Sequence, residues 1–199
     1  MIRNHQDKST IGAERRLHMT ATEILKHEHE IILMVLDAAE REIESIQGTG
    51  QVHRQNIEKM LDFFRSFADH CHHAKEEKHL FVKMKEKGMP DNSGPIFVML
   101  TEHNQGRSRL NAIAEVLGTA SEGSASAIQT VIDNLSGYVE LLRNHILKED
   151  NILFPAADKM FTPEDQKELM VSFEKVEAEE IGVGIHEKYH QIAHDLAKK

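Results

Sequence analysis

Two copies of one short motif carry the side chains best suited to chemistry in this chain. Residues 72–81 (HHAKEEKHLF) and 145–154 (HILKEDNILF) align without a gap and share His, Lys, Glu, Leu and Phe at the same five places. In a helix of 3.6 residues per turn, a His and a Glu four apart lie one above the other, roughly 6 Å apart along the axis. The pairs His72 with Glu76 and His145 with Glu149 could therefore hold one metal site from two helices.

Each copy taken alone has a simpler interpretation. A His and a Glu at this spacing also form an ordinary surface pair that stabilises a helix by a few tenths of a kcal/mol. A solvated pair, however, gives no reason for Leu and Phe to follow at the same offset, because these residues favour a core. The repetition therefore favours two pairs that face inward.

A second, weaker repeat precedes each copy. Residues 25–29 (LKHEH) and 99–103 (MLTEH) both end in Glu-His, and Leu36 and Leu110 follow seven residues after the two histidines. The chain thus alternates a Glu-His pair with a His-x-x-x-Glu pair, one element for each long helical segment.

This order of elements resembles the hemerythrin-like family, also called the HHE cation-binding domain. Proteins of that family are antiparallel four-helix bundles whose interior holds two iron ions, bridged by oxygen and by the carboxylates of the His-x-x-x-Glu pairs. The resemblance covers about residues 20 to 160 and implies Glu76 and Glu149 as the bridges. The metal ligands that it implies are His29, His72, Glu76, His103, His145 and Glu149.

The chain departs from the family pattern at one ligand. The blood-worm type of hemerythrin has five His ligands, two of them four residues apart on the third helix, but here Arg107 follows His103 at that distance. A histidine stripe near the C-terminus includes His186 and His190, beside an apolar stripe. The stripe is either the flank of a docking helix, or His186 or His190 supplies the missing ligand.

Other histidines near the motif are given smaller roles. We expect His70 and His73, which flank His72, to face away from the site. A ferritin-like carboxylate protein is the alternative fold, since its Glu-x-x-His signature occurs at Glu76 and His79 and again at Glu187 and His190. Position 152, where the second copy would need His, is Ile.

Composition and the positions of turn-forming residues predict an all-α chain: an antiparallel up-down-up-down four-helix bundle with a C-terminal helical extension. Trp is absent, aromatic residues are 5% of the chain, and runs of β-branched residues are scarce. We expect a flexible N-terminal arm over 1–19, the bundle over 20–160 and the extension over 161–199. The first expected helix runs from about 20 or 22 to 46, and the second ends near 88. The next two run from 95 to about 117 and from about 124 to between 155 and 160. The last two run from 162 to about 180 and from 185 onward.

Charge and cysteine content exclude several classes of partner and cofactor. A formal net charge of −9 without a basic stripe disfavours binding to nucleic acid or to an anionic membrane. The single cysteine, Cys71, excludes an intramolecular disulfide or a multi-cysteine metal site, and we expect it to be a small buried residue. No apolar run reaches about 18 residues and no signal peptide is found, so we expect a cytoplasmic protein.

The ligand set indicates the metal but leaves the activity open. Imidazoles and carboxylates without thiolate suit two iron ions, with zinc or manganese as alternatives. The first functional class is binding, storage or sensing of O₂, NO or peroxide without turnover. The second is an enzyme that removes peroxide, NO or O₂, or donates iron for iron–sulfur repair, and the third is a bundle with one non-redox metal. The sequence does not decide turnover, the redox partner protein or the oligomeric state.

Overall fold

The described part of the chain is built from helices joined by short turns. The structure is a computed structural model that describes residues 19–182 and 185–198, without the side chains of Glu180, Ile181 and His186. No strand occurs among the described residues, so the chain is all-α as the sequence predicts. Residues 1–18, which make up nearly all of the expected N-terminal arm, lie outside the described residues.

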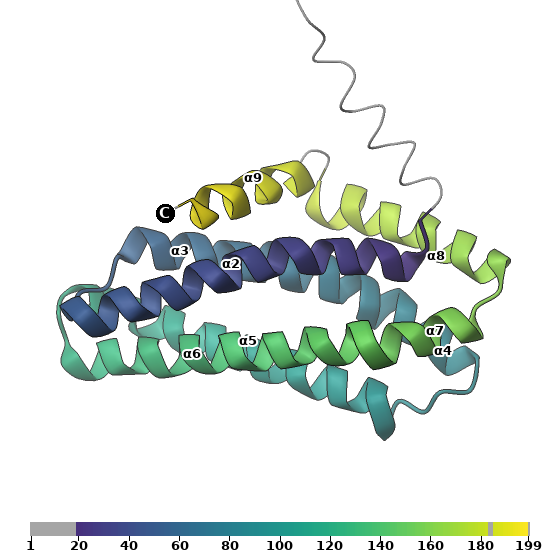
Figure 1. The fold of residues 1–199 in the computed structure, drawn as a ribbon, viewed down its shortest axis with the longest axis horizontal. Coiled ribbons are helices and arrows are strands. Elements are labelled where there is room, and N and C mark those ends of the chain that lie inside the picture. The colour runs from purple at the N-terminus through teal and green to yellow at the C-terminus, as the bar shows by residue number, and fades with distance from the viewer. Residues whose placement is uncertain (1–18, 183–184, 199) are drawn as a thin grey trace, which may run out of the picture.

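Long helical segments lie side by side along the long axis of the molecule, and the loops between them lie at its two ends (Figure 1). The segments up to residue 160 are α2 (Ala21–Thr49), α3 (Arg54–Phe63), η1 (Phe64–His73), η2 (Glu76–Leu80), α4 (Phe81–Glu86), α5 (Gly94–Ser121), α6 (Ala125–Lys148), η3 (Glu149–Leu153) and α7 (Phe154–Met160).

Local signals fix most of the helix ends. Thr20 caps α2, since its hydroxyl accepts a hydrogen bond from the Glu23 N–H while the Glu23 carboxylate accepts one from the Thr20 N–H. Gly50 ends the helix in a left-handed conformation, with φ of 69°, that favours glycine. The helix expected to end near Leu117 instead continues to Ser121. Ala120 is buried on that added turn, so packing outweighs the low helix propensity of glycine at position 118.

The helices that carry the doubled motif widen into π-helix at the motif. In the first copy η1 ends at His73 and η2 begins at Glu76, and in the second copy η3 begins at Glu149. A π-helical turn contains more residues than an α-helical turn, so consecutive side chains diverge by a smaller angle. Adjacent residues can then face the same side of the helix.

Two apolar clusters fill the interior, and a layer of polar side chains separates them. On α2, Leu25 belongs to one cluster and Ile32 to the other, and the buried Glu28 and His29 lie between them. The same alternation occurs on α5 around His103. The interior is thus interrupted by one buried polar layer at the level of the repeated motifs.

Three more segments follow the long helices and pack against them. They are α8 (Pro163–Lys175), η4 (Val176–Ile181) and α9 (Ile185–Ala197), and α8 and α9 lie along one side of α2 (Figure 1). Tyr189 and Leu196 of α9 join the larger apolar cluster, whereas Phe173 of α8 joins the smaller one. Among the described residues, no helix combines the length and the apolar character needed to cross a bilayer.

Candidate metal centre

The polar layer contains two groups of side chains that could each hold a metal ion. One group is His29, His72, Glu76 and Glu149, and the other is His73, Glu76, His103 and His145. Within each group the potential ligand atoms all lie within 4.8 Å of one another, and every member is buried. Glu76 belongs to both groups, so the two halves form one continuous site.

The two carboxylates lie between the halves. Glu76 places Oε1 3.6 Å from Nε2 of His72 and Oε2 3.5 Å from Nε2 of His103. Glu149 places Oε2 3.3 Å from Nε2 of His29 and Oε1 3.1 Å from Nε2 of His145. None of these four buried oxygens has a hydrogen-bond partner. Buried carboxylate oxygens without hydrogen bonds are costly, and a cation between them would remove that cost.

The imidazoles meet in pairs at a spacing that suits a shared metal ion. Nε2 of His29 lies 3.0 Å from Nε2 of His72, and Nε2 of His103 lies 3.0 Å from Nε2 of His145. Metal–nitrogen bonds of about 2.1 Å at right angles would separate two nitrogens by about 3.0 Å. The pairs therefore match the distance between neighbouring ligands of a six-coordinate ion.

A carboxylate accepts a hydrogen bond from the opposite ring nitrogen of each of these histidines. Nδ1 of His72 donates to Glu28 at 3.0 Å, and Nδ1 of His145 donates to Glu102 at 2.9 Å. In the same way Nδ1 of His29 donates to Asp150 at 2.8 Å, and Nδ1 of His103 donates to Glu77 at 2.6 Å. A proton on Nδ1 leaves the lone pair of Nε2 free for a metal, and the carboxylate increases the basicity of the ring.

Basic side chains hold the supporting carboxylates in turn. Lys75, which is fully buried, binds Glu28 and also binds Glu177 of η4 at 2.7 Å. Lys148 binds Glu102 from the corresponding place in the second copy of the motif. These contacts explain why both copies share a lysine, for which the sequence alone gave no reason.

Arg107 has a similar supporting role. Its guanidinium lies 2.6 Å from Glu77 and 2.7 Å from Asp69, and Glu77 in turn binds His103. These contacts lower the pKa of Glu77 to about 2, although burial alone would raise it. The arginine that replaces the expected histidine is thus a support for a neighbouring candidate ligand.

His73 lies inside the site, and the expectation that it faces elsewhere was wrong. Its ring stacks on His103 with centroids 3.8 Å apart, Nδ1 lies 3.4 Å from Asp69, and its buried Nε2 has no hydrogen-bond partner. Both His72 and His73 reach the interior because the π-helical η1 reduces the angle between consecutive residues. The only signal in the sequence is the His-His dipeptide itself.

Without a cation, the pKa shifts in the layer favour a proton on Glu76 and a second proton on the ring of His145. Burial and the negative charge of Glu149 raise the pKa of Glu76 well above its usual range. Burial would also raise the pKa of Glu149, but His145 and His29 lower it well below its usual range. Burial alone would lower the pKa of His145, yet Glu149 and Glu102 raise it to about 9. A bound cation would let both carboxylates ionise while the imidazoles stay neutral, so the donor set fits a metal.

The histidines near the C-terminus were expected as possible substitutes for the missing ligand. His190 belongs to neither group of candidate ligands, and its ring contacts Phe67 and His27 at centroid distances of 5.8 Å and 6.0 Å. The side chain of His186 lies outside the described residues.

Cys71 is buried, and burial and the charge of Glu28 raise the pKa of its thiol to about 12. It is a neutral, inert side chain at neutral pH.

A comparison with known protein families identifies the family of this chain. Residues 20–157 match the family described as the hemerythrin HHE cation binding domain, which is more than half of the chain. The chain belongs to the hemerythrin HHE cation-binding family. The match agrees with the resemblance found in the repeated motifs and favours it over the ferritin-like alternative.

Two relatives of this HHE-domain chain differ in how much they share with it. The uncharacterized protein Rv1995 of Mycobacterium tuberculosis is 23% identical over 170 residues, which cover 85% of this chain and 66% of that protein. The iron–sulfur cluster repair protein YtfE of Yersinia pestis is 35% identical over 89 residues, which cover 43% of this chain and 40% of that protein. The chain therefore matches less than two thirds of the length of these relatives. No solved structure shows significant similarity to the chain.

Proposed function

We propose that this chain is a non-haem di-iron protein of the hemerythrin type that binds O₂, NO or peroxide for storage, transport or sensing. The observation that carries the proposal is the position of Glu76 and Glu149, each with one oxygen near a histidine of each half. Two carboxylates that bridge two ions would occupy these positions, and all four oxygens lack hydrogen bonds.

The proposal assigns the candidate ligands to two ions in an antiparallel up-down-up-down four-helix bundle that spans residues 20–160. His29 and His72 would hold one ion and His103 and His145 the other, with Glu76 and Glu149 between them. His73 would add a third imidazole to the second ion. That addition supplies the fifth histidine that Arg107 does not provide.

The surrounding residues prepare these ligands for the metal. Iron in its ferrous state can bind a diatomic molecule by transferring electrons to it. Glu28, Glu77, Glu102 and Asp150 fix the imidazole orientations through Nδ1, so that each Nε2 would be the nitrogen that binds the metal. The two apolar clusters above and below the layer keep bulk water away from it.

Metal analysis with an optical spectrum before and after O₂ is added to the reduced protein tests the proposal. We expect two irons per chain and near-ultraviolet absorption of a bridged ferric pair after oxidation. Zinc alone, or one metal per chain after expression with ample iron, would refute the di-iron assignment. That result would favour a single non-redox metal, with zinc or manganese as the alternatives.

A second candidate function is enzymatic: removal of NO, O₂ or peroxide, or iron donation for iron–sulfur repair. The partial similarity to a protein named for iron–sulfur cluster repair supports it. Incubation of the iron-loaded chain with an enzyme whose iron–sulfur cluster has been damaged tests this function. Recovery of activity with iron-loaded wild type, and none with the same amount of free ferrous iron, would favour repair over storage.

Cell fractionation tests the expected cytoplasmic location, and co-purification from cells tests for a redox partner.

A further inference from the structure

The lysine shared by the two copies of the motif lies in two different surroundings. Lys75 is fully buried, whereas the side chain of Lys148 is 36% exposed. Among the described residues, Lys148 binds one carboxylate, that of Glu102. Lys75 binds two carboxylates, those of Glu28 and Glu177. The two halves of the site share one motif but differ by one negative charge at the lysine.

The second carboxylate on Lys75 comes from the C-terminal extension. Glu177 belongs to η4, and Phe173, four residues earlier, belongs to α8. Nζ of Lys75 lies 2.7 Å from an oxygen of Glu177 and 5.8 Å from the ring centroid of Phe173. Because both residues contact the same ammonium group, the junction of α8 and η4 covers Lys75.

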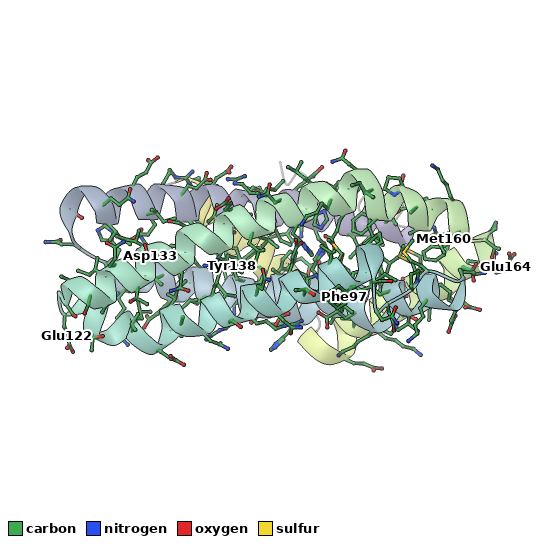
Figure 2. All side chains as sticks on the ribbon, turned by 90° about the horizontal axis from the view of Figure 1, so that it is seen from below. Phe97, Glu122, Asp133, Tyr138, Met160 and Glu164 are labelled. Carbon is green, nitrogen blue, oxygen red and sulfur yellow. The ribbon has the colours of Figure 1, made fainter. Side chains whose placement is uncertain are left out.

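The extension lies on the side of the first half of the site. Helices α8 and α9 pack on α2, and η4 packs on η1. In Figure 2, α5 and α6, which carry Phe97 and Tyr138, lie toward the viewer, and the extension, which is above the long helices in Figure 1, is on the far side. The histidines of α5 and α6 in the second half are His103 and His145. The charge of Glu177 is therefore placed beside the first half.

A continuous chain of contacts joins Glu177 to a candidate metal ligand. Lys75 binds Oε1 of Glu28, and Oε2 of the same carboxylate accepts a hydrogen bond from Nδ1 of His72 at 3.0 Å. The side chains of Lys75, Glu28 and His72 are at most 1% exposed, and that of Glu177 is 18% exposed. Water screens charges poorly in such surroundings, so each contact in the chain affects the next one.

The charge of Glu177 changes what Glu28 can do for His72. Lys75 shares its positive charge between two carboxylates, so Glu28 keeps more negative charge for the hydrogen bond from Nδ1. A stronger acceptor at Nδ1 makes Nε2 of the same ring a better electron donor to a metal. Added negative charge near the site also stabilises ferric over ferrous iron. Both effects lower the reduction potential at the first half.

We propose that Glu177 is a positioning residue that acts through Lys75 and Glu28 to lower the reduction potential of the ion held by His29 and His72. The extension then makes two metal positions, which the repeated motif would make alike, electronically unequal. This inference rests on the proposed function, because it concerns iron that changes oxidation state at this site. It goes further in giving the C-terminal extension a part in the chemistry of the site.

A redox titration of the iron-loaded full-length chain tests the role of Glu177. Glu177→Gln removes the charge and keeps the size of the side chain, so the ratio of ferrous to ferric iron at a fixed potential should rise about threefold or more. Glu177→Asp, which keeps the charge, should shift the ratio less. Glu179→Gln is the matched control, since it makes the same change at an exposed position of the same segment and should leave the ratio unchanged.

Two results of this titration would overturn the proposal. One is an unchanged ratio in Glu177→Gln with normal iron content, or a ratio that rises equally in Glu179→Gln. The other is loss of iron from Glu177→Gln, which would show that the residue holds the site together and does not tune it.

A second measurement is independent of iron. In the zinc-loaded full-length chain, the proton chemical shift of Nδ1–H in His72 reports the strength of its hydrogen bond to Glu28. Glu177→Gln should move this signal upfield and leave the Nδ1–H signal of His145, which binds Glu102, in place. No movement at His72, or equal movement at both histidines, would refute the proposal. If the chain binds no iron, the proposed function fails, and a shift confined to His72 would still support the positioning role.

Discussion

At the scale of single residues, each supporting carboxylate binds a candidate ligand histidine that a different segment contributes. The glutamate of each Glu-His pair binds the histidine of the following His-x-x-x-Glu pair, as Glu28 binds His72 and Glu102 binds His145. The lysine shared by the two copies of the motif then binds that glutamate. The repeated residues thus form a chain of contacts from a basic group through a carboxylate to an imidazole.

The two lysines differ in burial, which predicts a difference in stability. Lys75→Met removes one fully buried member of the ion pair with Glu28 and should lower the free energy of unfolding by about 3–5 kcal/mol. Lys148→Met is the matched control, because its side chain is 36% exposed and the loss should stay within about 1 kcal/mol. Urea unfolding of both variants with the metal bound provides the measurement. Equal losses would show that burial does not set the strength of these pairs.

His73 leads to a second prediction at this scale. His73→Ala should make the iron of the His103 and His145 half easier to remove, because that ion would lose one imidazole. His70→Ala is the control, since His70 is exposed on the same π-helical segment. Iron retained per chain during titration with a chelator distinguishes the two variants. Identical release curves for both variants and the wild type would remove His73 from the ligand set.

At the scale of elements, the helices of the site are held in register by their ends and by the extension that packs on them. Thr162 begins α8 with the same reciprocal cap that Thr20 forms at α2. Asp165 completes the cap, and Lys87 and the Thr162 N–H lower the pKa of its carboxyl group to about 2. The stabilisation from this carboxylate is therefore complete above the unfolded pKa near 4 and is lost as the pH falls toward 2.

The cap of α8 can be tested by removing one hydroxyl. Thr162→Ala should lower the free energy of unfolding by about 1 kcal/mol, because the N–H of Asp165 loses its acceptor. Thr101→Ala makes the same change inside α5, where the hydroxyl donates back to the Phe97 carbonyl. We expect the control to match or slightly exceed the wild type in thermal or urea unfolding. A loss in Thr101→Ala as large as in Thr162→Ala would contradict the assignment.

At the scale of the whole molecule, the extension makes the two halves of a repeated site unequal. Helix α9 adds Tyr189, Ala193 and Leu196 to the larger apolar cluster. Glu177 of η4 reaches Lys75, which connects the extension to the histidines of the first half through Glu28. The extension is therefore part of the folded core and supports one side of the site.

Docking of α9 leads to a prediction about stability and iron content. Tyr189→Ala should lower the free energy of unfolding by about 3 kcal/mol, because it removes a buried ring from the core. Tyr189→Phe should cost only about 1 kcal/mol, since it removes one hydrogen bond to Asp62. His190→Ala should leave the iron content unchanged, because the side chain lies outside both groups of ligands. Loss of iron in His190→Ala would return that residue to the ligand set.

The sequence by itself determined that the chain is all-α and which side chains share the faces that carry chemistry. A spacing of four residues on a helix fixes that His72 and Glu76, or His145 and Glu149, lie on one face, and this relation is local. The first helix was expected to end at 46 but continues to Thr49, and its end is local, because Gly50 adopts the left-handed conformation that favours glycine. The extension of α5 to Ser121 was missed because Ala120 is held by packing from other helices.

Only the tertiary structure decided which residues complete the site. An ideal α-helix turns His73 away from His72, and the π-helical segment that brings both inward depends on packing along the whole segment. The pairing of each carboxylate with a histidine of a distant segment is set by contacts between helices, which spacing along one helix does not encode.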